Sequence, residues 1–198
     1  MSNPEDILGK VQANWNKVEG LIAKVGEPRK TNLKKLISHF ENRLVTTPAS
    51  SKTNYYGAYL GGLIQHSLKT TGVMIKMMQA LDIKVPIDSV IMVGLFHDLG
   101  KVGSLEHDLF LEQKSDWHLK QGNLYEFNKD VKFMPAQMRS LYLLQHFGVQ
   151  LTEDEFTAIF SNNEEGASDI QSTSLSLLLQ QACKYSILET RGKTNIID

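Results

Sequence analysis

The sequence places a histidine next to an aspartate, His97 and Asp98, at the end of a long apolar stretch. Residues 90–96 read VIMVGLF, and Ser89 and Gly100 stand where one helix would need a cap and a stop. Such a helix is apolar on all sides and should be buried. An ionised carboxylate buried beside an imidazole is costly unless a positive charge compensates it, and a shared metal ion supplies that charge. The alternative is a pair that is merely hydrogen-bonded in the core.

A second histidine, His66, lies in a stretch that we expect to form the preceding helix, residues 57–81. Two imidazoles and a carboxylate suit Mn, Fe, Co, Ni or Zn better than Mg or Ca. We therefore expect His66 and the histidine–aspartate pair to converge on one divalent transition-metal ion. Gly61 and Gly62 are unfavourable inside a helix, so they indicate close approach of another backbone, a ligand or a tightly packed helix. Taken alone, His66 is more typical of a core or surface histidine.

Two motifs carry this pattern, GGLIQHSL at residues 61–68 and FHDLGK at residues 96–101. In combination they resemble the HD-domain metal-dependent phosphohydrolases, most closely a branch found in bacteria and tailed phages. The likeness extends over about residues 46–186. It implies an α-helical fold and a metal held by a histidine, a His-Asp pair and a second aspartate from the last helix. It also implies hydrolysis of phosphomonoesters or phosphodiesters, typically of nucleotides, nucleic-acid 3′ ends or signalling nucleotides.

By position, the resemblance assigns three of the four metal ligands to His66, His97 and Asp98. Cys183 stands where relatives carry the last aspartate. A thiolate there would bind metal and favour zinc and other soft ions, whereas a buried neutral thiol is the alternative. Without this ligand, water or a substrate phosphate must complete the metal shell.

Two further positions depart from the family pattern. Asn162 falls where many relatives have a histidine or aspartate, and Tyr56 falls where many have a histidine. Both losses argue against a two-metal centre, so we expect one ion.

The resemblance and the residue types together suggest roles in phosphoester hydrolysis. Asp98 would bind the metal and help to orient its water, while Lys101, assisted by Arg139, would neutralise charge on the phosphate. His118 is the candidate proton donor to the leaving oxygen, and Tyr56 is a candidate substrate contact. The alternatives are an exposed helix position for Arg139, a surface histidine packed on its neighbouring tryptophan for His118, and simple packing for Tyr56.

Apolar residues recur at helical spacing along most of the chain, and no alternating strand pattern is present. We predict an all-α fold, a single HD-domain-like bundle of about seven helices. Residues 103–135 form a long irregular connection after the His-Asp motif, which we expect to be a lid or a wall of the site. Capping boxes at Ser2 with Glu5 and at Thr152 with Glu155 begin two of the helices. The predicted helices span residues 2–25, 29–44, 57–81, 89–100, 135–147, 152–161 and 174–189.

The domain organisation follows from these helices. Residues 1–45 should form an N-terminal helical pair packed on the domain, residues 46–190 the HD-like domain and residues 191–198 a tail. A homodimer formed through the first helix is the less favoured alternative for that helix. An interaction protein that uses residues 7–25 to bind an unknown protein partner is a further possibility.

Composition sets limits on the class of protein. The 198 residues have 41% hydrophobic and 22% charged residues, a formal net charge of −1 and one cysteine. This balance gives no global attraction to nucleic acid or anionic membranes. No apolar run approaches a membrane span, and the acidic start does not resemble a signal peptide. We therefore expect a cytoplasmic protein without a membrane partner.

The leading functional hypothesis is a metal-dependent phosphohydrolase that acts on a nucleotide or nucleic-acid phosphate. The alternative is a degenerate HD domain that binds a nucleotide or a protein without turnover, as the substitutions at Cys183 and Asn162 suggest.

Overall fold

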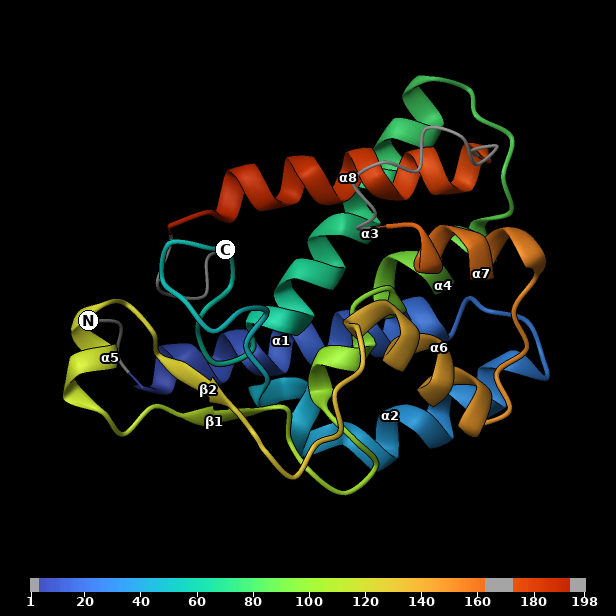
Figure 1. Cartoon of the computed structure of the whole chain (residues 1–198). Coiled ribbons are helices and arrows are strands. Elements are labelled where there is room, and N and C mark those ends of the chain that lie inside the picture. Colours follow the sequence, from blue (N-terminus) through green and yellow to red (C-terminus); the bar gives the residue numbers. More distant parts are fainter. Residues whose placement is uncertain (1–3, 163–172, 193–198) are drawn as a thin grey trace.

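Three helices that bring the candidate residues together pack against one another at the centre of a helical bundle (Figure 1). They are α3 (Gly62–Ala80), α4 (Ile87–Phe96) and α8 (Ser174–Thr190). The computed structural model describes residues 4–162 and 173–192, which are mostly helical, as predicted. The other elements are α1 (Pro4–Ile22), α2 (Arg29–Thr46), the 3-10 helix η1 (Leu99–Val102), β1 (Phe110–Glu112), α5 (Asp116–Lys120), β2 (Tyr125–Phe127), α6 (Ala136–His146) and α7 (Glu153–Phe160).

Helix α4 is buried along residues 89–96, as its uniformly apolar sequence predicts. Its predicted ends were wrong by a few residues. The helix begins at Ile87 after the extended Pro86, whereas Ser89 lies inside the helix and caps nothing. It ends at Phe96, and Gly100 belongs to η1. Proline fixes an extended entry and lacks an N–H, so the chain can turn into the helix directly after it.

The glycine pair that precedes His66 permits a close backbone approach. The predicted helix over residues 57–81 begins only at Gly62, because Gly57 and Gly61 have φ angles of 61° and 77° and form a loop. A Cβ atom on Gly62 would lie 2.0 Å from the carbonyl oxygen of Gly57. The chain therefore folds back on itself just before α3, and glycine is required where the two backbones meet.

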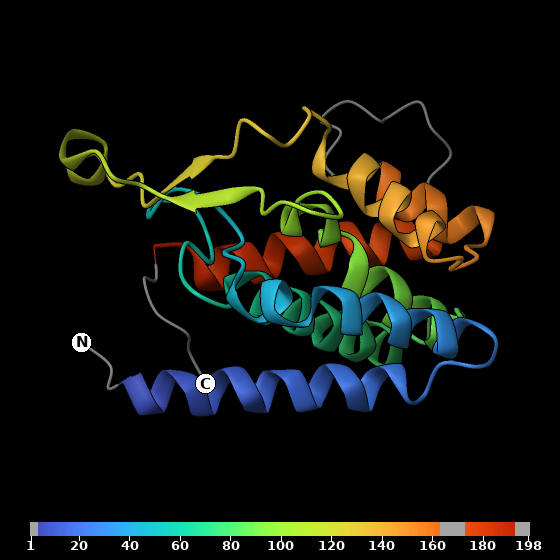
Figure 2. The same ribbon diagram turned by 90° about the horizontal axis from the view of Figure 1, so that it is seen from below.

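Residues 103–135 are not a featureless loop. Strands β1 and β2 pair antiparallel, with Phe110 opposite Phe127, and the short helix α5 connects them. Figure 2 shows this hairpin on one side of the bundle, with α5 at its outer end. Each strand has three residues, too few for an alternating pattern to be recognised in the sequence. Over residues 4–162 and 173–192 the chain is thus predominantly helical with one small sheet, rather than purely all-α.

The N-terminal helices contribute to the same core as α4. Trp15, Val18 and Ile22 of α1 and Leu33 and Phe40 of α2 are buried in that core. Figure 2 shows α1 lying along the side of the bundle opposite the hairpin. The predicted cap at Ser2 lies outside the described residues. None of the helices in the described part of the chain has the length and hydropathy that a membrane span needs.

The remaining helices closely follow their predicted bounds. The capping box of Thr152 and Glu155 is present at the start of α7, so this prediction is confirmed. Helices α2, α6 and α8 differ from the predicted ranges by at most two residues at either end.

Candidate metal centre and adjoining cavity

The end of α4 fixes the orientation of His97. Its backbone N–H continues the helix by donating to Val93 O at 3.0 Å, and its Nδ1 lies 3.0 Å from Gly94 O. Because a carbonyl can only accept, Nδ1 carries the hydrogen in the neutral ring and Nε2 presents its lone pair. That Nε2 lies 3.4 Å from Sγ of Cys183. The side chain is thus oriented as a metal-binding histidine would be.

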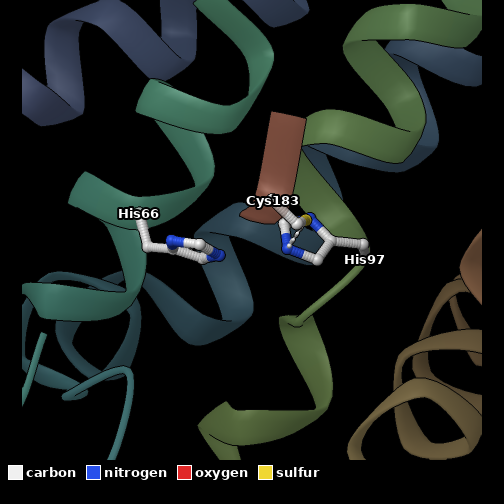
Figure 3. A group of neighbouring side chains, drawn as sticks. All are labelled: His66, His97 and Cys183. Carbon is white, nitrogen blue, oxygen red and sulfur yellow. Dashed lines mark hydrogen bonds between the residues drawn. The ribbon is translucent and has the colours of Figure 1, made fainter. Parts of the chain in front are cut away.

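His66 is buried at 3% exposure, and neither of its ring nitrogens has a hydrogen-bond partner among the described residues. Its ring lies between Tyr56 and His97, at centroid distances of 4.5 Å and 5.4 Å. Figure 3 shows it directed toward His97 and Cys183. Burial, aided by the neighbouring His97, holds the pKa of His66 well below its usual value. A neutral imidazole with two unpartnered nitrogens is an available ligand, since buried polar groups are otherwise hydrogen-bonded.

Cys183 comes to the same point from α8, at 5% exposure. The ligand atoms of His66, His97 and Cys183 all lie within 4.8 Å of one another, so this group could hold a metal ion. Asn162, just beyond α7, points its Nδ2 at the cysteine sulfur from 3.5 Å. The four side chains come from four different segments, and only the packing of α3, α7 and α8 around the end of α4 brings them together.

Asp98 lies against this group at 1% exposure. Its Oδ2 is 3.7 Å from Nε2 of His97 and 3.9 Å from Nε2 of His66. The structure therefore brings together all three residues that the sequence assigned to a common ion. Burial by itself would raise the pKa of Asp98, but Lys101 and the two imidazoles outweigh it and hold that pKa below its usual range. The other oxygen, Oδ1, has no hydrogen-bond partner within the described residues.

Lys101 and Tyr56 contact the same Asp98 oxygen that lies near the histidines. Nζ of Lys101 lies 2.6 Å from Oδ2 of Asp98 and donates to the Tyr56 hydroxyl at 2.7 Å. The Tyr56 hydroxyl is also 3.4 Å from Oδ2 of Asp98. Burial and the Asp98 charge raise the pKa of Tyr56 to about 12, so the phenol keeps its proton at neutral pH.

A cavity of about 510 Å³ opens from this layer. Tyr56, Lys101 and Arg139, the three predicted substrate-binding residues, all line it. The hairpin and the segment before α6 form the opposite wall, so the predicted wall function of residues 103–135 fits the structure. The apolar lining comprises Ala49, Tyr55, Leu109, Phe110, Phe127, Val131, Phe133, Met134, Pro135 and Ala136.

Arg139 joins α6 to η1 beneath the cavity. Its Nη1 donates to Gly100 O at 3.2 Å and its Nη2 to Lys132 O at 2.8 Å. The residue is 5% exposed, so the alternative of an exposed helix position was wrong. A Cβ on Gly100 would lie 2.1 Å from Ala136 O, which explains the glycine at this position of the FHDLGK sequence.

His118 lies elsewhere. It is exposed on α5, beside Trp117, with ring centroids 4.9 Å apart, at the outer end of the hairpin (Figure 2). This is the surface packing that the sequence offered as the alternative. The structure does not place His118 near the histidine–cysteine group, and the proton-donor role has no geometric support.

Arg43 has a structural role that the sequence did not predict. Its Nη2 donates to Val102 O at 2.7 Å and to Ser104 O at 2.9 Å, and its Nε contacts Asp108 at 2.6 Å. These bonds hold the segment between η1 and β1, and thereby the cavity wall, against α2. An arginine on an amphipathic helix carries no local sign of such a role, because its acceptors are about 60 residues away.

A larger hollow, of about 730 Å³, lies between α1 and α3. Four lysines line it, but no member of the histidine–cysteine group does. Size therefore does not identify the reactive site, and we assign the site by the chemistry of its residues.

The HD-domain resemblance rests on the motifs at residues 61–68 and 96–101. Comparisons with family models, with curated proteins and with solved structures found no match to this chain.

Proposed function

We propose that this chain is a metal-dependent phosphohydrolase of the HD-domain type that cleaves a phosphoester of a nucleotide or nucleic acid. One observation carries the proposal: Lys101 and Tyr56 contact Asp98 beside the histidine–cysteine group and also line the 510 Å³ cavity. An anionic group that enters the cavity therefore meets the Lys101 ammonium, which is in direct contact with Asp98 beside the metal-binding residues.

The donors in this group fit a divalent transition metal. Two imidazole nitrogens, a sulfur and a neighbouring carboxylate are the ligand types that such ions prefer. An ion in this space would bind one of the two unpartnered nitrogens of His66. A bound ion would supply Lewis-acid polarisation of the phosphoryl oxygen and activation of water.

The chain's own residues supply charge and position. The Lys101 ammonium donates to Asp98 and Tyr56 and has one hydrogen left for a phosphate oxygen, since an ammonium has three. The protonated Tyr56 hydroxyl becomes a second donor if its hydrogen turns from Asp98 Oδ2, 3.4 Å away, to the phosphate. Arg139 fixes the η1 backbone through Gly100 O and so keeps Lys101 directed at the cavity. Preorganised donors of this kind stabilise charge that develops in the transition state.

The test is phosphate release by metal-loaded protein from a panel of esters. The panel contains nucleoside monophosphates, a 3′-phosphorylated oligonucleotide, a cyclic dinucleotide, and the nitrophenyl mono- and diesters, each assayed with Mn, Fe, Co, Ni and Zn. We expect turnover that His97→Ala or Asp98→Asn lowers by about 10²-fold or more, while His146→Ala, a change at an exposed histidine of α6, leaves it unaltered. Equal rates in all four proteins would contradict the proposal.

A binding module without turnover is the second candidate. The ion pair of Lys101 with Asp98 favours it, because a carboxylate already neutralised by an ammonium has less need of a metal. Saturable nucleotide binding that Lys101→Met weakens, with no phosphate release in any metal, would select this function over the first.

A further inference from the structure

We propose that Cys183 binds the metal as a thiolate, so that the centre is a mononuclear His66–His97–Cys183 site selective for zinc(II) and other thiophilic ions. This inference rests on the metal centre of the proposed function and names the class of ion that the site takes. The resemblance implies an aspartate at this position of the last helix, so a thiolate centre departs from the pattern.

The geometry of the group suits a tetrahedral ion. In a tetrahedral site, Zn–N bonds of about 2.0–2.1 Å and Zn–S bonds of about 2.3 Å place nitrogen and sulfur about 3.5–3.6 Å apart and two nitrogens about 3.3–3.4 Å apart. The His97 Nε2–Cys183 Sγ distance of 3.4 Å is close to the first value. All three ligand atoms lie within 4.8 Å of one another, so the side chains need only a small shift to close around an ion. Asp98 lies beside these ligand atoms, with its Oδ2 3.7 Å from Nε2 of His97 and 3.9 Å from Nε2 of His66.

His66 independently indicates a ligand at this point. The side chain is 2% exposed, and both ring nitrogens are buried without a partner among the residues described. Its ring is directed into the space in front of Cys183 and His97 (Figure 3). A core histidine selected only for packing would leave two polar atoms desolvated with no compensation.

Asn162 donates a hydrogen bond to the sulfur of Cys183. Its amide Nδ2 points at Sγ from 3.5 Å, and an N–H directed at sulfur stabilises the anionic form. Such contacts to a ligand are the usual means by which a protein orients and tunes a metal-bound group. Asn162 and Cys183, the two residues that differ from the family pattern here, are thus in contact with each other.

Charge favours the thiolate as the anionic ligand. The Asp98 carboxylate is held by Lys101 at 2.6 Å, so its negative charge is already matched. A dication beside two neutral imidazoles still requires an anion, and Cys183 is the group in position to provide it. Thiolate sulfur binds zinc more strongly than it binds harder ions such as manganese or magnesium.

The experiment titrates metal-free protein with cobalt(II) and records the near-ultraviolet thiolate-to-cobalt charge-transfer band. The sequence contains a single cysteine, so any such band reports Cys183. We expect the band in the wild-type protein, at one equivalent of cobalt, and its loss when one equivalent of zinc is added. Cobalt bound at one equivalent without the band would overturn the proposal, as would failure to bind cobalt at all.

Two variants sharpen the test. Cys183→Ser should remove the band and weaken zinc binding at least tenfold. Cys183→Asp, which restores the carboxylate that the resemblance implies, should bind cobalt without the band and shift the zinc-to-manganese affinity ratio at least tenfold toward manganese. An unchanged ratio in Cys183→Asp contradicts the assignment. The wild-type measurement stands even if a variant does not fold.

The outcome is separable from that of the phosphohydrolase proposal. Metal-dependent phosphate release by a protein without the band would refute thiolate ligation and leave the hydrolase standing. The charge-transfer band in a protein that cleaves no phosphoester would support thiolate ligation and refute the hydrolase.

Discussion

Lys101 follows Asp98 by three residues, and its Nζ lies 2.6 Å from Oδ2 of Asp98. Their side chains are 14% and 2% exposed, so the pair is shielded from water on most sides. The turn of η1 produces this contact, because the backbone N–H of Lys101 donates to Asp98 O at 3.0 Å. The ion pair therefore forms the boundary between the metal-binding residues and the cavity.

The first prediction concerns this pair. Lys101→Met leaves a buried carboxylate without its cation, and removing one partner of a buried pair costs about 3–5 kcal/mol. We expect the free energy of unfolding of the metal-free protein at pH 7 to fall by roughly that amount, measured by urea denaturation. The control is Lys76→Met, at an exposed position on α3, which should change it by less than about 0.5 kcal/mol.

The same pair predicts the acid behaviour. A carboxyl whose pKa is lowered on folding contributes stability that is present above its unfolded pKa, near 4, and lost as the pH falls through the folded pKa. The wild-type protein should therefore gain stability from Asp98 as the pH rises from strongly acid values to about 5. Lys101→Met removes the largest of the charges that lower the pKa of Asp98, so that gain should shrink. Parallel stability curves for the two proteins would rule out this account.

The second prediction concerns His97 in the metal-free protein. Burial lowers the pKa of His97, but Cys183 and Asp98 outweigh it and raise that pKa to about 9. A histidine with a raised pKa contributes stability that is fully present below its unfolded value, near 6.5, and lost as the pH rises through about 9. Relative to His97→Gln, the wild-type protein should lose up to about 3 kcal/mol over this window. Burial holds the pKa of His66 below its usual value, so above about pH 6.5 His66 is neutral in both the folded and the unfolded protein and adds little to the difference.

The third prediction tests the backbone approach before α3. Gly62→Ala places a Cβ 2.0 Å from Gly57 O, and overpacking of this kind costs about 1–3 kcal/mol. The matched control is Gly72→Ala in the same helix, where nothing lies within 4 Å of the new Cβ. That change should raise stability by about 0.5–1 kcal/mol, because alanine is the better helix former. Equal thermal shifts in both variants would contradict the packing argument.

The fourth prediction tests the cavity wall. Phe127 lines the cavity and is 64% exposed, so its ring is available to a bound group. Phe127→Ala should raise KM for a nucleotide substrate roughly fivefold, as expected for one lost stacking contact of about 1 kcal/mol. The value of kcat should stay within about twofold, because the ring is not among the charged groups that act on phosphate. Leu111→Ala is the control on the facing strand, since Leu111 is not part of the cavity lining; an equal effect there would mean a general disturbance of the hairpin.

Local sequence determined the helices and the composition of the centre. Apolar spacing predicted α2, α6 and α8 to within two residues, because a helix buries a face whose period is set by its own geometry. The apolar run before His97 predicted burial of α4. The glycine pair before His66 indicated close approach of a backbone, a ligand or a helix, and in the structure it is a backbone that approaches. These properties depend on residues within a few turns of one another.

Tertiary structure alone decided which of these residues meet. His97 and Cys183 are 86 positions apart, and their contact depends on how α8 packs against α3 and α4. The same packing brings Asn162 to the cysteine sulfur and leaves His118 at the outer end of the hairpin. The three-residue strands of the cavity wall are stabilised by pairing across the hairpin, a contact between segments that has no periodic signature in either of them. Periodicity encodes the face that a helix buries, whereas the partner of that face is chosen by the packing of the whole core.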